Sequence, residues 1–210
     1  EISECLVGSE MCIRDRDKIM QRNVLEYLEE TVKRVPDKIA FANDKTQLTF
    51  QQFSDDIRAI GSELIRKGYQ KEPVLIYMNK SPEALEGFFG VIESGCFYVP
   101  LDEEMPKRRI ELIIENTKAR VIICDQENLK RVKELPFDGE IMLHEELAKK
   151  REDKEKLDKV RRTALDTDPL YVLFTSGSTG MPKGVVGHHR GVIDYIDPVS
   201  YTHLTLPTNS

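Results

Sequence analysis

Hydrophobic residues recur along the chain with two different spacings, which predict alternating helices and strands. In residues 19–34 and 53–65, apolar positions lie three or four residues apart, as on one face of an α-helix. Pro36 ends the first of these helices and Gly68 ends the second. Between them, short apolar runs around a polar turn within residues 39–50 predict a small hairpin.

Four short, continuous apolar runs predict strands that are covered on both faces. They occupy residues 74–78, 96–99, 121–124 and 170–174, and Pro100 ends the second of them. Helical patterns separate these strands. Ser81 and Pro82 begin one helix, which closes near Gly95, and Pro106 begins another. Strands that alternate with helices predict an α/β fold, with a mostly parallel sheet joined by right-handed crossover helices.

Composition changes this picture mainly by exclusion. The 210 residues are 40% hydrophobic and 32% charged, which suits a soluble globular chain of one domain or one and a half. The net charge of -6 argues against a nucleic-acid partner. No apolar run approaches the roughly 18 residues that span a bilayer, and the N-terminus lacks the pattern of a signal peptide. We therefore expect a cytoplasmic protein without a membrane partner.

Two further features have simple structural interpretations. The four cysteines Cys5, Cys12, Cys96 and Cys124 form no CxxC pair and have no cluster of metal ligands beside them. We expect free buried thiols, with neither a disulfide framework nor a metal site. The densely charged segment 148–162 predicts a solvated helix or linker, with a partner-binding segment as the alternative.

The two ends of the chain carry a pattern of a different kind. Residues 11–15 can be encoded by DNA whose reverse complement encodes residues 199–203. The shared element resembles the inverted transposon end that is joined to fragments in sequencing-library preparation. We therefore expect residues 1–16 and 198–210 to be adapter-derived, and residues 17–197 to be the native segment.

The strongest chemical signal is the loop after the strand at 170–174. It reads Thr175-Ser176-Gly177-Ser178-Thr179-Gly180-Met181-Pro182-Lys183. Its glycines let the backbone approach phosphate closely, its hydroxyl groups add neutral donors, and its lysine adds a mobile positive charge. The usual P-loop is a poor match, because Lys183 is followed by Gly184 rather than by Ser or Thr. The loop predicts a polyphosphate site, with a ligand-free Gly/Ser hairpin as the alternative.

At these residues the chain resembles the AMP-forming, adenylate-forming (ANL) superfamily, which includes acyl-CoA synthetases, luciferases and nonribosomal peptide synthetase adenylation domains. Residues 48–53 are similar to the family's LTYxEL stretch. Residues 94–102 are similar to AGxAYVPLD, and Pro106 and Arg109 continue as the family does. The run Tyr98-Val99-Pro100-Leu101-Asp102 favours the amino-acid-activating branch, which includes D-alanine–carrier-protein ligases. The resemblance implies that residues 17–197 are part of the large N-terminal domain of an adenylation enzyme.

The resemblance also implies a reaction and its cofactors. ATP and an amino-acid or other carboxylate would give an acyl-adenylate, and the acyl group would pass to phosphopantetheine on a carrier protein, or to CoA. The loop residues Thr175, Ser176, Gly177, Ser178, Thr179, Gly180 and Lys183 would hold the ATP phosphates with Mg²⁺. No catalytic residue is assigned, because the family's transition-state lysine has no counterpart before the foreign tail begins. This chain alone is therefore expected to be inactive in adenylation.

Several alternatives stay open on the sequence alone. The chain could derive from an acyl-CoA synthetase, or be a non-catalytic nucleotide-binding module. His188 and His189 could act as a base or as metal ligands, but we expect them to begin a helix beside the nucleotide cleft. Arg190 could meet a phosphate or form an exposed salt bridge. Asp102, Asp166 and Asp168 are expected in turns and caps rather than in catalysis.

Overall fold

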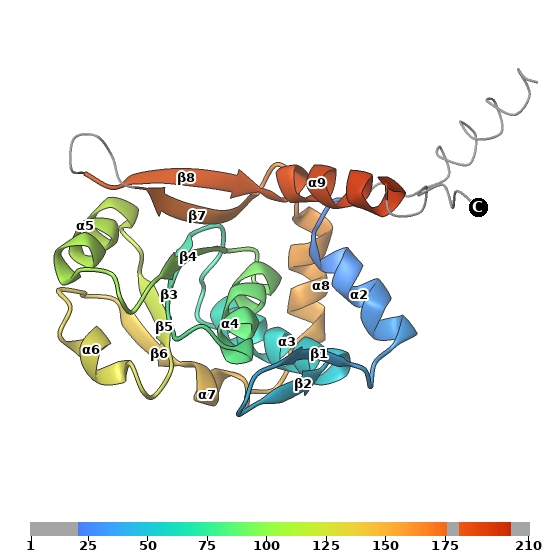
Figure 1. The fold of residues 1–210 in the computed structure, drawn as a ribbon, viewed down its shortest axis with the longest axis horizontal. Coiled ribbons are helices and arrows are strands. Elements are labelled where there is room, and N and C mark those ends of the chain that lie inside the picture. The colour runs from blue at the N-terminus through green and yellow to red at the C-terminus, as the bar shows by residue number, and fades with distance from the viewer. Residues whose placement is uncertain (1–20, 176–180, 203–210) are drawn as a thin grey trace, which may run out of the picture.

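The computed structural model describes residues 21–175 and 181–202, and the described part is built from strands and helices that alternate along the chain (Figure 1). The strands are β1 (Ile39–Ala42), β2 (Gln47–Thr49), β3 (Pro73–Tyr77), β4 (Phe97–Leu101), β5 (Val121–Cys124), β6 (Glu140–Leu143), β7 (Pro169–Thr175) and β8 (Lys183–His188). The helices are α2 (Leu25–Arg34), α3 (Phe50–Arg66), α4 (Pro82–Glu93), α5 (Lys107–Thr117), α6 (Leu129–Lys133), α7 (His144–Leu147), α8 (Lys154–Thr163) and α9 (His189–Thr202).

The larger sheet confirms the predicted α/β class. Its strand order is β6-β5-β3-β4-β7-β8. Every neighbouring pair is parallel except β7 and β8, which are antiparallel. The small antiparallel pair of β1 and β2 confirms the predicted hairpin. Because β3, β4, β5 and β7 run in one direction, their carboxyl ends lie along the same edge of the sheet, where α/β proteins place their ligands.

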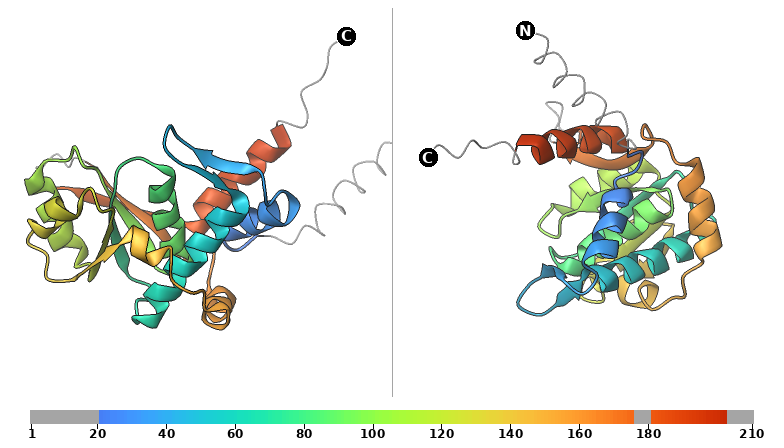
Figure 2. Two further views of the ribbon diagram at one scale, coloured as in Figure 1. Left: turned by 90° about the horizontal axis from the view of Figure 1, so that it is seen from below. Right: turned by 90° about the vertical axis from the view of Figure 1, so that its right-hand side faces the viewer.

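Successive residues of β3 build cores on opposite faces of the sheet, as its continuous apolar run predicted. Val74 and Ile76 pack in one core, to which α3, α4 and α7 contribute. Leu75 and Tyr77 pack in the other core, to which α5 and α6 contribute. All four side chains are buried. The sheet is therefore a central layer between two layers of helices (Figure 2).

A third core joins the beginning of the described chain to its end. Leu25 in α2, Phe53 in α3, Leu170 in β7 and Ile193 in α9 are all buried in this cluster. The contact sets α9 beside α2, although their sequences are far apart (Figure 1). This core thereby supports β7 and β8 at the end of the hairpin that is opposite its connecting loop.

Local hydrogen bonds explain where several helices begin. Thr49 and Gln52 form a reciprocal capping box at the start of α3, and the side chain of Ser81 caps α4. The sequence predicted a helix over residues 19–34. Among the described residues of that range, the helix α2 begins at Leu25, and residues 21–24 are not helical. The Asn23 Oδ1 accepts the Leu25 amide at 3.0 Å, so the chain turns before the helix starts.

Two parts of the sheet differ from the prediction. Pro100 lies inside β4 rather than ending it. The ladder with β7 joins Tyr98 to Tyr171, and the proline lies beyond it, where a missing N–H breaks no bond to that strand. The short elements α6, β6 and α7 were not predicted, because runs of four or five residues carry too little periodicity to be recognised.

The charged segment 148–162 contains a helix, α8, which is largely solvated as expected. One residue, Leu157, is buried. On its inner side, Arg161 lies 3.4 Å from the buried carboxylate of Glu93 in α4. The segment thus covers the α3–α4 layer of this chain, and the partner-binding alternative stays a prediction.

The two predicted tails fall mostly on residues 1–20 and 203–210, which lie outside the described structure. At the second junction, α9 runs from His189 through residue 197 to Thr202. The boundaries at 16/17 and 197/198 stay a prediction. Within the described residues, the structure contains no helix that is long and apolar enough to cross a membrane.

Candidate functional site

The β7–β8 hairpin sets the two described ends of the candidate phosphate loop opposite each other. Thr175, the last residue of β7, pairs in register with Lys183, the first residue of β8. The Thr175 hydroxyl donates to the Lys183 carbonyl oxygen at 3.4 Å. The Lys183 side chain is exposed at this edge. Ser176, Gly177, Ser178, Thr179 and Gly180 lie outside the described residues, so their part in the site stays a prediction.

Two glycines after Lys183 allow β8 to lie closely against β7. A Cβ atom on Gly187 would lie 2.3 Å from the Tyr171 ring, and one on Gly184 would lie 2.9 Å from the Val172 side chain. Neither position has room for a larger residue without a shift. The close approach keeps the two strands in the register that brings Thr175 and Lys183 together.

The structure brings one further side chain to the end of β7, which the sequence did not predict there. The Arg109 Nη2 donates to the Phe174 carbonyl oxygen at 2.9 Å, directly before Thr175. The sequence held one signal, because the first turn of α5 contains three basic residues and no acidic one. Helix N-termini usually favour acidic side chains, so this turn departs from the common pattern.

Of the two histidines that were expected to begin a helix, only His189 does so, because His188 is the last residue of β8. His189 begins α9, and its buried Nδ1 accepts the Val24 amide at 3.3 Å. Burial, with a smaller contribution from the charge of Arg161, lowers the pKa of His189 to about 4. The Nδ1 of His188 lies 2.7 Å from the Thr167 carbonyl oxygen. The neutral imidazole of His189 therefore serves packing.

Asp102 and Asp168 take the expected turn roles, whereas the side chain of Asp166 forms an ion pair. Arg190 forms ion pairs with Asp166 and Asp194, so the salt-bridge alternative describes its position. Asp168 accepts the Leu165 amide at 2.9 Å, as a turn residue does. Asp102 likewise accepts the amide of the residue two positions later at 2.9 Å. These carboxylates stabilise turns and local ion pairs.

The described cysteines agree with the expectation of free thiols. Cys96 and Cys124 are unpaired and buried. Burial raises the pKa of both thiols, that of Cys124 to about 12, so neither is a reactive thiolate near neutral pH. Across residues 21–175 and 181–202, no group of three His, Cys, Asp or Glu side chains could hold a metal ion.

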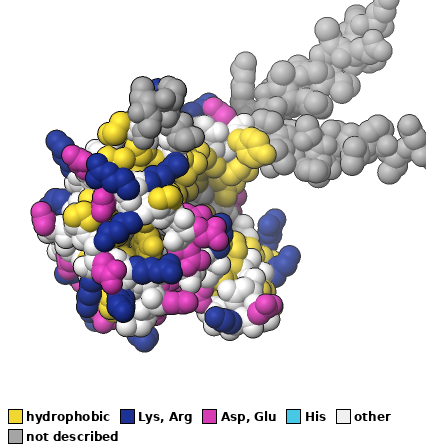
Figure 3. All heavy atoms as spheres, turned by 60° about the vertical axis from the view of Figure 1, so that its left-hand side comes forward, with side chains coloured by type: hydrophobic (Ala, Val, Ile, Leu, Met, Phe, Trp, Pro, Cys, Tyr) yellow, Lys and Arg dark blue, Asp and Glu magenta, His cyan; other side chains and the backbone are white. Residues whose placement is uncertain are grey.

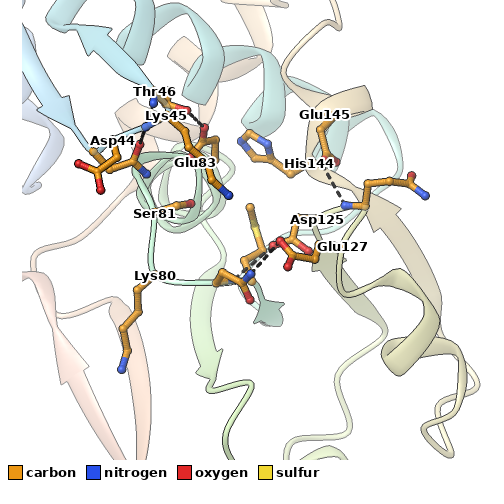
Figure 4. A pocket seen from close by; sticks show the side chains of 14 residues that line it. Asp44, Lys45, Thr46, Lys80, Ser81, Glu83, Asp125, Glu127, His144 and Glu145 are labelled. Carbon is orange, nitrogen blue, oxygen red and sulfur yellow. Dashed lines mark hydrogen bonds between the residues drawn. The ribbon is translucent and has the colours of Figure 1, made fainter.

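A polar cleft of about 520 Å³ lies at the carboxyl ends of β3 and β5 (Figure 4). It is at this point that the connections leave the sheet in opposite directions, since β4 lies on one side of β3 and β5 on the other. Several of its polar groups form hydrogen bonds within the chain. Asp125 accepts the amides of Asn79 and Asn128, and Glu83 accepts the Thr46 hydroxyl at 2.6 Å. Within the described residues, however, the buried Oε2 of Glu145 in the same lining has no hydrogen-bond partner.

Behind this cleft lies a buried group of ionisable side chains. His144 and Glu86 are both almost fully buried, and their Nε2 and Oε2 atoms are 2.8 Å apart. Asp56 in α3 adds a second carboxyl group beside Glu86. Burial, together with the charge of Glu86 and a hydrogen bond to it, raises the pKa of Asp56 to about 7.

A second cleft of about 760 Å³ lies between the ends of β3 and β4 and the start of α4. Its lining is more apolar and includes Leu85, Phe88, Leu101 and Met105. Asp102 lies at its rim, on the segment that resembles the family's second motif. The sheet edge that carries the candidate phosphate loop therefore also carries two clefts.

Comparison with known sequences finds relatives along most of the chain. Residues 28–207 match the model of a family described as AMP-binding enzymes. Gramicidin S synthase 2 of Brevibacillus brevis is 32% identical over 177 residues, which are 84% of this chain and 4% of that protein. Gramicidin S synthase 1 of the same organism is 30% identical over 172 residues, which are 81% of this chain and 15% of that protein.

Comparison with solved structures finds the same fold. The nonribosomal peptide synthetase FmoA3 in its AMPPNP-bound form has a TM-score of 0.75 at 22% identity, over 90% of this chain and 20% of that chain. VinN has a TM-score of 0.71 at 19% identity, over 87% of this chain and 50% of that chain. The chain thus spans about half of VinN, and only 4% and 15% of the two gramicidin S synthases.

Proposed function

This chain belongs to the family of AMP-binding enzymes, and we propose that it is the phosphate-binding part of an ATP-dependent, AMP-forming ligase for amino acids. The observation that carries the proposal is the β7–β8 hairpin. It sets the Thr175 hydroxyl and the Lys183 backbone side by side at the edge of the sheet where the parallel strands have their carboxyl ends. The predicted phosphate loop connects these two residues.

The residues at this edge suit a polyphosphate. Hydroxyl and backbone N–H groups donate to phosphate oxygens without adding bulk, and a lysine ammonium provides a compact charge. Lys183 makes no ion pair with a carboxylate among the described residues, so its charge is available to a ligand. We assign Ser176, Gly177, Ser178, Thr179 and Gly180 to the same site on their sequence alone.

In the proposed first step, a carboxylate oxygen of the amino acid attacks the α-phosphorus of ATP. The bond from that phosphorus to the bridging oxygen breaks, and an acyl-adenylate and pyrophosphate form. In the second step, a thiol attacks the acyl carbonyl, which gives a thioester, AMP and a proton. The hairpin residues would orient the β- and γ-phosphates so that pyrophosphate is held as it leaves.

Mg²⁺ would offset the charge of the phosphates. Magnesium commonly binds through substrate phosphates and water with only one or two protein ligands, so the site requires no dedicated cage of carboxylates. The hydroxyl-rich, lysine-bearing hairpin fits that arrangement, because the phosphates themselves would supply most of the charge that the ion needs.

The relatives support an amino acid as the substrate and a carrier-protein phosphopantetheine thiol as the acceptor. FmoA3 is a nonribosomal peptide synthetase, and it was also solved bound to α-methyl-L-serine-AMP. An acyl-CoA synthetase is less well supported, because the Tyr98-Val99-Pro100-Leu101-Asp102 run favours the amino-acid branch. The buried free thiols of Cys96 and Cys124 suit a reducing compartment, and we place the ligase in the cytoplasm.

Calorimetric titration of the 210-residue chain with ATP in excess Mg²⁺ tests the proposal. We expect wild-type chain to bind ATP, and Lys183→Ala to bind about tenfold more weakly, which corresponds to about 1.4 kcal/mol. Lys33→Ala is the matched control, because Lys33 is an exposed lysine in α2 and should leave the affinity unchanged. We also expect no ATP–pyrophosphate exchange by this chain, which spans half of VinN.

Two results would contradict the proposal. If the wild-type chain shows no ATP binding, or if Lys183→Ala and Lys33→Ala bind equally well, the hairpin is not a phosphate site. Efficient exchange activity by the chain alone would instead show that the described fold already contains a complete ligase centre.

A further inference from the structure

A buried triad of ionisable side chains, Asp56, Glu86 and His144, joins α7 to α3 and α4 behind the polar cleft. The Nε2 atom of His144, the first residue of α7, lies 2.8 Å from the Oε2 atom of Glu86 in α4, and the two side chains are only 5% and 3% exposed. Asp56 in α3 lies within hydrogen-bonding reach of Glu86. Figure 4 shows the His144 imidazole among the side chains that line the cleft. The three helices therefore meet at one buried contact that is also part of the cleft wall.

The hydrogen bonding of Glu86 requires a proton on the neighbouring carboxyl group. Its Oε1 atom is buried and accepts no hydrogen bond from an N–H or hydroxyl group of the described residues. Two ionised carboxylates only accept hydrogen bonds, so the contact between Asp56 and Glu86 is favourable when one of them is protonated. Burial, the charge of Glu86 and a hydrogen bond to Glu86 raise the pKa of Asp56 to about 7, although the charge of His144 acts against them. The triad therefore holds a proton at a pH at which an exposed aspartate has lost it.

The charges around Asp56 offer little compensation once that proton is lost. The groups that act on it most strongly are Glu86 from α4, His144 from α7 and Asp55 from α3 itself. Glu83, also from α4, lines the cleft and acts on His144. Among these groups, His144 is the single one that can carry a positive charge. Loss of the proton thus leaves two adjacent carboxylates, partly removed from water, with one imidazole to balance them, and this arrangement is costly.

The short helix α7 depends on its tertiary contacts. It has four residues, which are too few for a helix to be stable on its own. Leu147 packs in the core on one face of the sheet, and the triad holds the first residue of the helix, His144. The Ala148 amide donates to the His144 carbonyl oxygen at 3.0 Å. Exchange of the Ala148 amide hydrogen therefore reports how often the helix opens.

We propose that the buried triad is a proton-operated contact that fixes α7 as one wall of the polar cleft. While the proton is bound, the Asp56 carboxyl group donates to Glu86 and the contact is closed. Opening of α7 lets water reach both carboxyl groups, and the Asp56 O–H bond then breaks with release of the proton to solvent. Because the closed form binds this proton more tightly than the open form, opening becomes more frequent as the pH rises towards about 7. The contact is independent of the candidate phosphate loop.

Amide hydrogen exchange of the 210-residue chain, followed by NMR at Ala148 and corrected for the intrinsic effect of pH, tests this contact. We expect the opening constant of wild-type α7 to rise about tenfold between pH 5.5 and 7 and to level off above about pH 8. Asp56→Asn keeps an N–H donor for Glu86 but has no proton to release, so its opening constant should stay unchanged over this range. Asp55→Asn is the matched control, because Asp55 is the exposed neighbour in the same helix, and it should retain the wild-type rise.

The pH profile separates this role from simple packing, because loss of a packing contact would weaken α7 equally at every pH. A flat profile for Asp56→Asn with a wild-type rise for Asp55→Asn supports the inference. It is overturned if the wild-type chain shows no rise, if Asp56→Asn rises as wild type does, or if Asp55→Asn is flat as well.

Circular dichroism establishes that each variant is folded. If Asp56→Asn does not fold, the assigned Cγ resonance of Asp56 in the wild-type chain decides the question. Titration of that resonance near pH 7 supports the inference, and titration below about pH 5 overturns it.

Discussion

His189 illustrates how a residue with a common catalytic side chain serves the fold instead. It is 4% exposed, and its Nδ1 accepts the Val24 amide, which ties the start of α9 to the start of α2. An acceptor nitrogen must be unprotonated, and burial further disfavours the charged form. The pKa near 4 thus follows from the position of the ring between two helices rather than from a role in proton transfer.

This position predicts an acid-sensitive contribution to stability. Between pH 6.5 and 4 the unfolded chain binds a proton at His189 and the folded chain does not, so stability is lost as the pH falls through this range. Urea unfolding should show that His189→Asn, whose side-chain oxygen can accept the Val24 amide, loses about 2 kcal/mol less than wild type between pH 7.5 and 5.

His188→Asn is the control and should keep the wild-type dependence, because His188 is exposed. The raised pKa of Asp56 acts in the opposite direction, since the folded chain keeps that proton up to about pH 7. The difference between His189→Asn and wild type therefore measures the histidine, and equal slopes for the two would rule out the assigned role.

At the scale of the elements, α3 and α4 pack closely because glycines lie where they meet. A Cβ atom on Gly90 would lie 2.5 Å from the Ile60 side chain, and one on Gly61 would lie 2.6 Å from that of Glu93. Both helices also contribute large apolar side chains, such as Leu64 and Val91, to the core on this face of the sheet. Close packing of this kind leaves no room for an added methyl group.

Gly90→Ala should therefore destabilise the chain by about 1–3 kcal/mol, although alanine is the better helix former. Gly191→Ala in α9 is the matched control, because a Cβ atom there meets no described atom within 4 Å, and it should stabilise by up to about 1 kcal/mol. Chemical unfolding of both variants gives the comparison. A Gly90→Ala chain as stable as wild type would show that the two helices can separate at little cost.

At the scale of the whole molecule, the hairpin that carries the candidate site also exposes apolar surface. Leu173 and Val185 are partners in the β7–β8 register, and they are 45% and 54% exposed. Val186 is 47% exposed. Hydrophobic side chains are visible on the upper part of the face in Figure 3. The other edge of β8 pairs with no strand among the described elements, and such edges promote association.

We expect the chain to self-associate through this hairpin. Replacing Leu173 and Val185 together by threonine keeps strand propensity but lowers the apolar area, so the weight-average mass at high concentration should fall towards that of a monomer. Light scattering across a concentration series measures this. Ile39→Thr, at an exposed position in β1, should leave the mass unchanged; the same decrease in that control would assign the association to general hydrophobicity.

Much of the architecture could be predicted from local patterns. The apolar runs at 74–78 and 121–124 correspond to buried strands, and the 53–65 pattern corresponds to α3. A strand that is buried on both faces has a continuous run of apolar residues, whereas a helix that is buried on one face has apolar residues every three or four positions. The two kinds of element can therefore be distinguished from the sequence without knowledge of the fold. Short elements such as β6 and α7 leave no such spacing, and they were missed.

The class of the fold and the family could both be predicted from the sequence alone, because the backbone and side-chain requirements of strands, helices and turns are local. The assignment of the loop from Thr175 to Lys183 to phosphate rests on the same kind of local pattern and stays a prediction. Three contacts emerged only once the chain was folded: Arg109 bonds the Phe174 carbonyl, His189 is held neutral beside Val24, and Asp56 approaches Glu86. These contacts join residues far apart in the chain. They depend on which helix covers which face of the sheet, and hydrophobic periodicity contains no information about that choice.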